Sequence, residues 1–360
     1  LNLSVEVNGD IFHNLHLFAN PIDKFRPSDK EIKRALKKKK GSNLIYFGPG
    51  VHNLPNDTLF VPSGTTVYID GGARVYGNIF TEGAHDVNIF GRGEVHPDGR
   101  GAGVWVRRSK NVRIDGIVVS QLPIGQCDSV ELTNVKSISY YGWGDGMDVF
   151  SSSNVILDGV FCRNSDDCTA VYASTQGFKG GSNNVLVKNA TLWADVAHPI
   201  NIGGHGDPNG MDTVQNVTFR NIDILDQAEK QIDYQGCLAI NPGDNTLVRN
   251  ITFENIRIED FRNGQLVNFR ISFNPKYCVS TGRGIHNVLV KDVTYNGSGE
   301  NLSIIAGYDE NHKISGIRFV NLVVNGRKIT DDMPGKPKWY KTGDMAGIFI
   351  GEHVENISFE

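Results

Sequence analysis

The chain has 360 residues, a formal net charge of −4 and 39% hydrophobic residues, which is enough apolar content to bury a large core. The slightly acidic balance argues against a nucleic-acid partner, and no apolar run is long enough to span a bilayer. The 41 glycines and the many short Val- and Ile-rich segments predict short strands joined by tight turns.

The first 40 residues differ in pattern from the rest of the chain. Residues 1–21 alternate between apolar and polar like an antiparallel strand pair, and residues 23–40 indicate a linker with a helix. We therefore predict that residues 1–40 form an N-terminal β segment and linker, the remnant of or link to an upstream β-sandwich domain. Residues 41–360 are predicted to form one long domain.

A short pattern returns along most of that long domain: Asn or Asp, then Val or Ile, then alternating apolar and polar residues. Examples are "NVRIDGIVVS" at Asn111, "NVILDGVFC" at Asn154, "NVTFRNIDIL" at Asn216 and "NITFENIRIE" at Asn250. No unit of this kind can bury its apolar face alone, so the units must stack. The pattern predicts an all-β fold, a right-handed parallel β-helix, with Asn and Gly at the bends. A β-sandwich is the alternative, although two-residue hairpin signals are sparse.

The chain contains five cysteines, an odd number, and all lie in or beside strand-like segments. This distribution indicates small core residues rather than a disulfide framework. No Cys and His spacing is typical of a zinc site. The cysteines are Cys127, Cys162, Cys168, Cys237 and Cys278.

Two adjacent carboxylates, Asp166 and Asp167, stand just before the apolar run "TAVYA". Like charges this close raise each other's cost of ionisation, and a partly buried strand end adds to that cost. One of the two carboxyl groups is therefore expected to hold a proton near neutral pH. Asp145 lies 21 residues before Asp166, about one coil, so stacking places the three carboxylates on one face.

Later coils supply further polar groups to the same groove, namely His198, His205 and Arg270. Three carboxylates, an imidazole and a guanidinium suit inverting glycoside hydrolysis, which needs a protonated acid, a base for water and a group that holds the sugar. Aromatic and polar residues nearby are candidates for sugar contacts. These are Trp143, Tyr172, Trp193, Asp148 and His198.

Four motifs in this order, "GDGMD", "SDDCTAV", "GGHG" and "FRIS", resemble the polygalacturonase family of glycoside hydrolases, and more loosely the dextranase and isopullulanase family. The resemblance covers roughly residues 43–308 and implies an inverting mechanism without metal or cofactor. It implies that Asp166 is the general acid and that Asp145 and Asp167 activate water. His205 would support the protonation of the acid, with His198 as its rival, and Arg270 would contact substrate on the leaving-group side.

Two positions depart from the polygalacturonase pattern. Trp143 stands where that family has Asn, and Ser272 stands where it has Lys. A missing cation leaves two explanations, either that Lys276 replaces it or that the sugar is neutral. The Trp fits the dextranase-like side, because aromatic faces stack on uncharged sugars.

The sequence therefore predicts a secreted or periplasmic inverting glycoside hydrolase whose partner is a polysaccharide or oligosaccharide, pectic or related, with the oligomeric state left open. The first alternative is a dextranase- or isopullulanase-type hydrolase of a neutral α-glucan. The second is a non-catalytic β-helix that binds carbohydrate or acts as an adhesin. The third is a β-helix polysaccharide lyase that uses a cation such as Ca²⁺.

Overall fold

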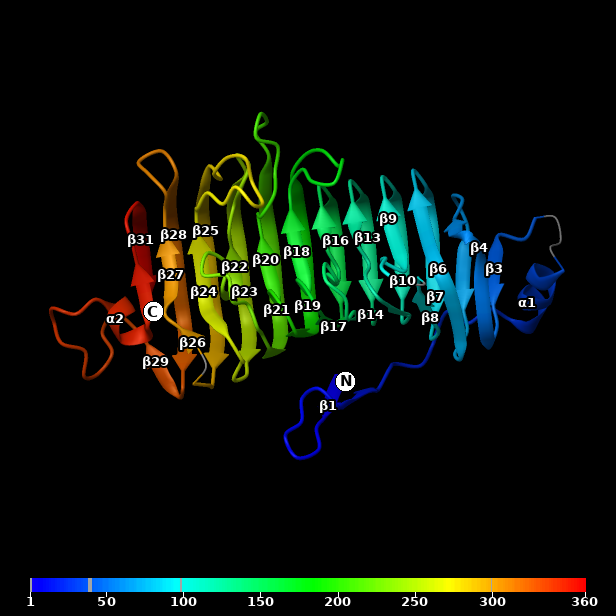
Figure 1. Cartoon of the computed structure of the whole chain (residues 1–360), viewed down its shortest axis with the longest axis horizontal. Helices are drawn as coiled ribbons and strands as arrows, with labels where there is room; N and C mark the ends of the chain where they lie inside the picture. Colours follow the sequence, from blue (N-terminus) through cyan, green and yellow to red (C-terminus); the bar gives the residue numbers. More distant parts are fainter. Residues whose placement is uncertain (1, 38–40, 98, 299) are drawn as a thin grey trace.

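The computed structural model describes residues 2–37, 41–97, 99–298 and 300–360, and it confirms the predicted right-handed parallel β-helix. The coils follow one another along the long axis of the molecule, from β3 at one end to β31 at the other (Figure 1). The strands of successive coils pair in parallel, and they stack in three columns.

The first column runs the whole length of the helix and contains its longest strands. It consists of β3 (Leu44–Phe47), β5 (Thr66–Ile69), β7 (His85–Gly91), β10 (Lys110–Asp115), β13 (Asp128–Thr133), β16 (Ser153–Asp158), β19 (Ser182–Ala194), β21 (Thr213–Asp226), β23 (Leu247–Ile258), β25 (Gly284–Tyr295), β28 (Lys313–Val324) and β31 (Val354–Phe359).

The second column is separate only in the first half of the helix, because from β19 onward one long bent strand serves both columns. It consists of β4 (Gly50–Phe60), β6 (Ala73–Glu82), β8 (Glu94–His96), β11 (Val118–Val119), β14 (Lys136–Ile138) and β17 (Phe161–Asn164).

The third column carries the candidate site. It consists of β9 (Val104–Arg107), β12 (Ile124–Gly125), β15 (Val149–Phe150), β18 (Thr169–Tyr172), β20 (Ile200–Ile202), β22 (Gly236–Ile240), β24 (Gly264–Arg270), β26 (Glu300–Asn301), β27 (Ser303–Ala306) and β30 (Ile348–Ile350). Near the C-terminus, β29 (Arg327–Ile329) pairs antiparallel with β28, and α2 (Thr342–Ala346) follows it.

The recurring Asn occupies a bend near the start of each first-column strand, and the sequence predicted Asn at the bends. Asn154, Asn184, Asn216 and Asn250 have φ of 57°, 56°, 55° and 55°, a left-handed conformation that Asn tolerates better than most residues. Their amides also connect neighbouring coils, since Asn184 Nδ2 donates to Asn154 Oδ1 at 2.7 Å and Asn250 Nδ2 donates to Asn216 Oδ1 at 3.1 Å. The residue after each Asn points inward, so the bend fixes which face of the strand is buried.

An internal ladder of β-branched side chains follows from that register. Its members pair directly from coil to coil and are almost fully buried: Val155, Val185, Val217, Ile251 and Val288. All five cysteines are also buried and unpaired, and four of them pack in the hydrophobic core as the sequence predicted, namely Cys127, Cys162, Cys168 and Cys237.

The N-terminal segment lies alongside the helix (Figure 1). It contains an antiparallel hairpin of β1 (Asn2–Val5) and β2 (Leu15–Phe18), and then α1 (Asp29–Leu36), which begins with a capping box. Arg163 fixes the hairpin, because its guanidinium donates to Asn14 Oδ1 at 2.6 Å and to the carbonyl oxygen of Ile11 at 3.0 Å. The division at residue 40 stays a prediction, and residues 38–40 of the predicted linker lie outside the described residues.

Trp193 lies beneath this hairpin rather than in a groove. It is only 2% exposed, its Nε1 donates to Asp195 Oδ1 at 3.1 Å, and the Arg163 guanidinium lies 4.3 Å from its ring centre. The interpretation of Trp193 as a sugar platform is therefore wrong, because a segment distant in sequence covers its face. Neither described helix has the length and apolarity that crossing a membrane requires.

The left-handed bend gives a first test. We expect Asn216→Ala to lower the free energy of unfolding by about 2 kcal/mol, because a Cβ-bearing residue without a side-chain amide is strained there and the ladder bonds are lost. Asn216→Gly should lose less, since Gly adopts positive φ freely. Urea unfolding measures both, with Thr218→Ala on the same strand as control. Equal losses for the Gly and Ala variants would contradict the backbone explanation.

Candidate active site

Three carboxylates meet at the N-terminal ends of two neighbouring strands of the third column. Asp145 lies in the loop before β15, and Asp166 and Asp167 lie in the loop before β18 on the next coil. One oxygen of each carboxylate lies within 4.8 Å of the others. The structure thus brings together the three acidic residues that coil spacing had grouped.

Asp167 is buried and its carboxylate is fully occupied by hydrogen bonds. Its Oδ1 accepts from the backbone N–H of His198 at 3.1 Å and lies 2.6 Å from His198 Nδ1. Its Oδ2 accepts from the Tyr172 hydroxyl at 2.8 Å and from Asn201 Nδ2 at 2.9 Å. Four contacts use all the lone-pair positions of a carboxylate, so Asp167 has none left for a cation or a water molecule.

His198 is the partner that keeps Asp167 ionised. Burial favours the neutral imidazole, but the Asp167 charge and hydrogen bond outweigh it and raise the pKa of His198 to about 9. Burial likewise opposes the charge on Asp167, yet the imidazolium and the bonds from Asn201 and Tyr172 hold the pKa of Asp167 below its usual value. The pair is therefore charged at neutral pH.

The pKa values of the other two carboxyl groups, Asp166 and Asp145, are raised rather than lowered. Burial, and then the neighbouring Asp167 charge, raise the pKa of Asp166 to about 7. Burial, and then the charges of Asp166 and Asp167, raise the pKa of Asp145 well above its usual value. Burial is the largest cause at both residues and the fixed charge on Asp167 adds to it, so both carboxyl groups hold a proton to higher pH than a free carboxyl group does.

The loop that carries Asp145 is held in a strained conformation. Trp143 has φ of 61°, which is rare for a bulky residue, and its side chain is 66% exposed. Gln121 Nε2 donates to the carbonyl oxygen of Trp143 at 2.9 Å, and Ser165 Oγ donates to that of Tyr141 at 2.5 Å. Strain fixed by neighbours is common at functional sites, and here it directs an indole ring to the rim.

The three carboxylates and Trp143 line a cleft of about 590 Å³. Its acidic members are Asp145, Asp148, Asp166, Asp167 and Glu229, and its aromatic members are Tyr140, Tyr141, Trp143, Phe150, Tyr172, Tyr234 and Tyr277. On one side, two loops meet across the cleft, where the Tyr277 hydroxyl donates to Gln231 Oε1 at 2.7 Å. The combination of acids and aromatic faces suits a carbohydrate.

The remaining predicted site residues fall into different environments. His205 lines the cleft with its ring edge-on to Tyr172, at a centroid distance of 5.1 Å, and burial lowers its pKa. Asp148 is buried, and its Oδ1 accepts from the backbone N–H of Ala170 at 3.0 Å. Arg270 is not among the described residues that line the cleft, and its Nη1 donates to Asp233 Oδ1 at 2.7 Å.

Several cleft residues were not predicted from the sequence. Asn201 lies between the two histidines in "HPINIGGHGD", and its place in β20, opposite Ala170 of β18, is a signal that the repeat register contains. Glu229, Tyr234 and Tyr277 come from loops of variable length, which carry no such register. Lys276 was considered only as a replacement for a missing cation.

The coils and the cleft define a class of protein: a parallel β-helix with an acidic, aromatic-rimmed groove on one sheet. Residues 104–333 match the model of glycosyl hydrolases family 28, and the chain belongs to this family.

A curated relative agrees with this assignment, and solved structures share the fold. The chain is 26% identical over 311 residues to a probable endopolygalacturonase D of Emericella nidulans, a match that covers 77% of the chain and 55% of the relative. Two solved structures share the fold. The family 28 exopolygalacturonase of Yersinia enterocolitica has a TM-score of 0.61 and 13% identity, with 87% of this chain and 72% of that chain covered. Dex49A from Penicillium minioluteum has a TM-score of 0.59 and 15% identity, with 88% and 60% covered.

The matches cover only part of each relative. The chain spans 39% to 57% of the length of the curated relatives that it matches first.

The His198 and Asp167 pair predicts a specific dependence of stability on pH. The folded-state pKa of His198 is raised above the unfolded value, so its contribution is complete below about 6.5 and is lost as pH rises through about 9. We expect the free energy of unfolding to fall by up to about 3 kcal/mol across that range. His198→Gln should flatten this dependence. Chemical unfolding at several pH values measures it.

His205→Gln is the matched control for that experiment, because burial lowers the pKa of His205 instead. A wild-type protein whose stability is constant between pH 6.5 and 9.5 would contradict the charged pair.

Proposed function

We propose that the chain is an inverting glycoside hydrolase that cleaves a pectic polysaccharide, with Asp166 as the general acid. The observation that carries this proposal is the division of charge among three adjacent carboxyl groups. Asp167 is held ionised by His198, while the pKa of Asp166 is raised to about 7. A carboxyl group that keeps its proton near neutral pH beside a fixed negative charge suits a general acid.

Asp166 would donate its proton to the glycosidic oxygen as the bond to the anomeric carbon breaks. Asp145 is the better candidate for the base that activates water, because among the described residues no other residue hydrogen-bonds its carboxylate. It acts as a base in the protonation state in which Asp166 carries the proton and Asp145 is ionised. The Asp167 carboxylate already makes four hydrogen-bond contacts. We therefore assign it two roles, to keep a negative charge beside Asp166 and to position His198 and Tyr172. This division differs from the resemblance, in which Asp145 and Asp167 share the activation of water.

The stereochemistry is the finer part of the proposal. Nearest oxygens of the carboxylates lie within 4.8 Å, less than the separation of about 6.5–9.5 Å between the carboxyl groups of most inverting enzymes. Asp167 has no free lone pair with which to act as a nucleophile, and this favours attack by a water molecule that Asp145 activates. Retention is the competing outcome.

Lys276 favours an acidic sugar over a neutral one. It is the only Lys or Arg among the described residues that line the cleft, and the Tyr277 hydroxyl and the Glu229 and Asp166 charges help to raise its pKa. Its Nζ lies 3.5 Å from Gln231 Oε1, so it is directed across the cleft. A galacturonate carboxylate needs a cation of this kind.

The wider parts of the proposal follow from the substrate. Polysaccharides of this type lie outside cells, so we infer a secreted or periplasmic enzyme. Residues 41–360 would form the catalytic β-helix, and residues 1–40 would be the remnant of or link to an upstream domain. The neutral α-glucan hydrolase and the non-catalytic binding protein are separated from the proposal by activity on a panel of polymers.

Asp166→Asn is the direct test of the acid. Wild type should release reducing sugar from polygalacturonan and not from dextran, and the variant should lose about 100-fold or more, because Asn has no acidic proton. The wild-type rate should fall as pH rises through about 7, where Asp166 loses its proton. Asp158→Asn, a partly exposed carboxylate outside the cleft, is the control.

Proton NMR of the first product gives the stereochemistry of the same reaction. The product anomer opposite to that of the substrate supports inversion, and the same anomer would refute it. Full activity in folded Asp166→Asn would remove Asp166 from the proposal, and a wild type inactive on all polymers would favour the binding protein.

Lys276→Met tests the preference for an acidic sugar. We expect kcat/KM on polygalacturonan to fall about 10- to 100-fold, which corresponds to the loss of one hydrogen bond between charged groups. Activity on highly methyl-esterified pectin should change little, because its ester groups carry no charge. Comparing the two substrates for wild type and variant measures this, and an equal loss on both would contradict a charge-specific role.

A further inference from the structure

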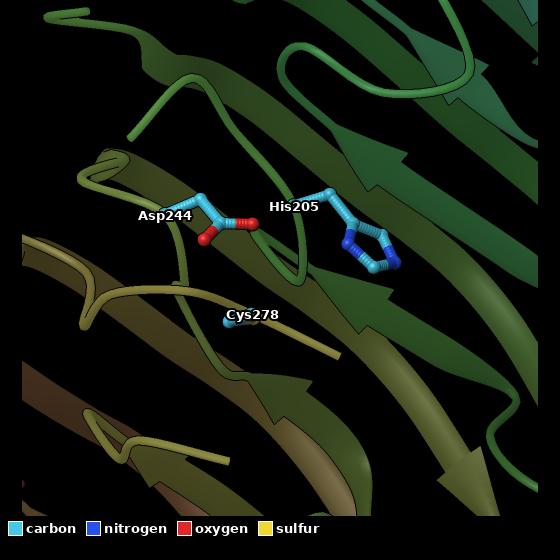
Figure 2. A group of neighbouring side chains, drawn as sticks. All are labelled: His205, Asp244 and Cys278. Atoms are coloured by element: carbon cyan, nitrogen blue, oxygen red, sulfur yellow. The ribbon is translucent and has the colours of Figure 1, made fainter. Parts of the chain in front are cut away.

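A second cluster of chemically distinct side chains lies next to the cleft, and one of its members, His205, also lines the cleft. His205 follows β20, Asp244 follows β22, and Cys278 lies in the loop between β24 and β25. These three strands are consecutive in the third column, so stacking alone brings the loops together (Figure 2). One ligand atom of each side chain lies within 4.8 Å of the others.

Backbone N–H groups hold the side chain of Asp244 in place. Asp244 Oδ1 accepts from the N–H groups of Val279 and Ser280 at 2.7 and 3.3 Å, which ties the Asp244 loop to that of Cys278. Among the contacts of the described residues, Asp244 Oδ2 has no hydrogen bond. The carboxylate can therefore offer one oxygen without giving up the bonds that position it.

The Cys278 sulfur lies in a space that only a glycine leaves open. A Cβ added to Gly243 would lie 2.3 Å from Cys278 Sγ, so any side chain there would displace the sulfur. The thiol donates to the carbonyl oxygen of Gly204 at 3.3 Å, next to His205. The sulfur is thus directed toward the same loop that carries the imidazole.

We propose that His205, Asp244 and Cys278 bind a divalent transition-metal ion of the zinc class, and that this ion inhibits hydrolysis in the cleft. Imidazole nitrogen, carboxylate oxygen and thiolate sulfur are the ligand types that Zn²⁺ takes, whereas Ca²⁺ and Mg²⁺ take oxygen alone. Ligand atoms lie about 3.5 Å apart around tetrahedral zinc, so shifts of about 1 Å close the site. The fourth position is left for water.

Binding exchanges a proton for a metal ion. The S–H bond of Cys278 breaks, its proton passes to solvent, and the sulfur forms a bond to the metal. The imidazole of His205, which lines the cleft, is then bound to the metal ion and is no longer free to contact substrate there. The inhibitory part of the proposal rests on the proposed function, in which His205 lines the catalytic cleft, whereas the binding part does not.

Cobalt(II) titration of the chelator-treated full chain tests binding without any activity. We expect a thiolate-to-cobalt charge-transfer band in the near ultraviolet that saturates at one ion per chain and disappears when Zn²⁺ is added. Cys278→Ser should abolish the band while its hydroxyl keeps the bond to Gly204, and Asp244→Asn should weaken cobalt binding by about 100-fold or more. Circular dichroism checks that both variants fold.

Cys127→Ser is the matched control, since it removes a buried thiol that lies outside the cluster. A wild type without the band, or a band that persists in Cys278→Ser, would overturn the metal site. Zn²⁺ should lower polygalacturonan hydrolysis in wild type and Cys127→Ser and far less in Cys278→Ser, and equal inhibition in all three would overturn the inhibitory role. A cobalt band in a protein that hydrolyses no polymer would support the metal site and refute the proposed function.

Discussion

The register of the coils is the constraint on which the rest of the structure depends. Each left-handed Asn at the first-column bend fixes the inward residue that follows it, so Val and Ile lie above one another from coil to coil. A shift of one residue would turn this apolar ladder outward. Because the ladder sets the position of every strand, the loops between strands can change in length and sequence without moving the core.

That freedom explains why polar groups gather at the third column. Asp166 and Asp167 lie at the start of one strand, while His205 lies beyond the end of the next strand in the stack. The carboxylates thus lie before the third-column strands, and the proposed metal-ligand set lies beyond the other end of those strands. Within the first group, His198, Tyr172 and Asn201 fix the charge on Asp167, and that fixed charge is one cause of the raised pKa of Asp166. Burial and this hydrogen-bonded carboxylate together therefore hold the pKa of Asp166 near 7.

The sequence predicts what the coil period controls. The Asn and Val pattern was sufficient for the fold, and the step of 21 residues grouped Asp145 with Asp166. It does not predict what variable loops and distant segments control. The hairpin before residue 20 buries Trp193, and loop length places His198 on Asp167 and Arg270 on Asp233. A zinc-type spacing could not be seen, because His205, Asp244 and Cys278 lie on three coils.

The two histidines show how one groove assigns opposite roles to one residue type. His198 is enclosed beside an ionised carboxylate, so the field of Asp167 raises its pKa to about 9 and keeps it a cation at neutral pH. His205 is also largely enclosed, yet burial lowers its pKa and keeps the imidazole neutral. A neutral imidazole can accept a proton or bind a metal ion, whereas a cation can do neither. The ionised Asp167 is therefore what distinguishes the two histidines, because it hydrogen-bonds His198 and holds the proton on that imidazole.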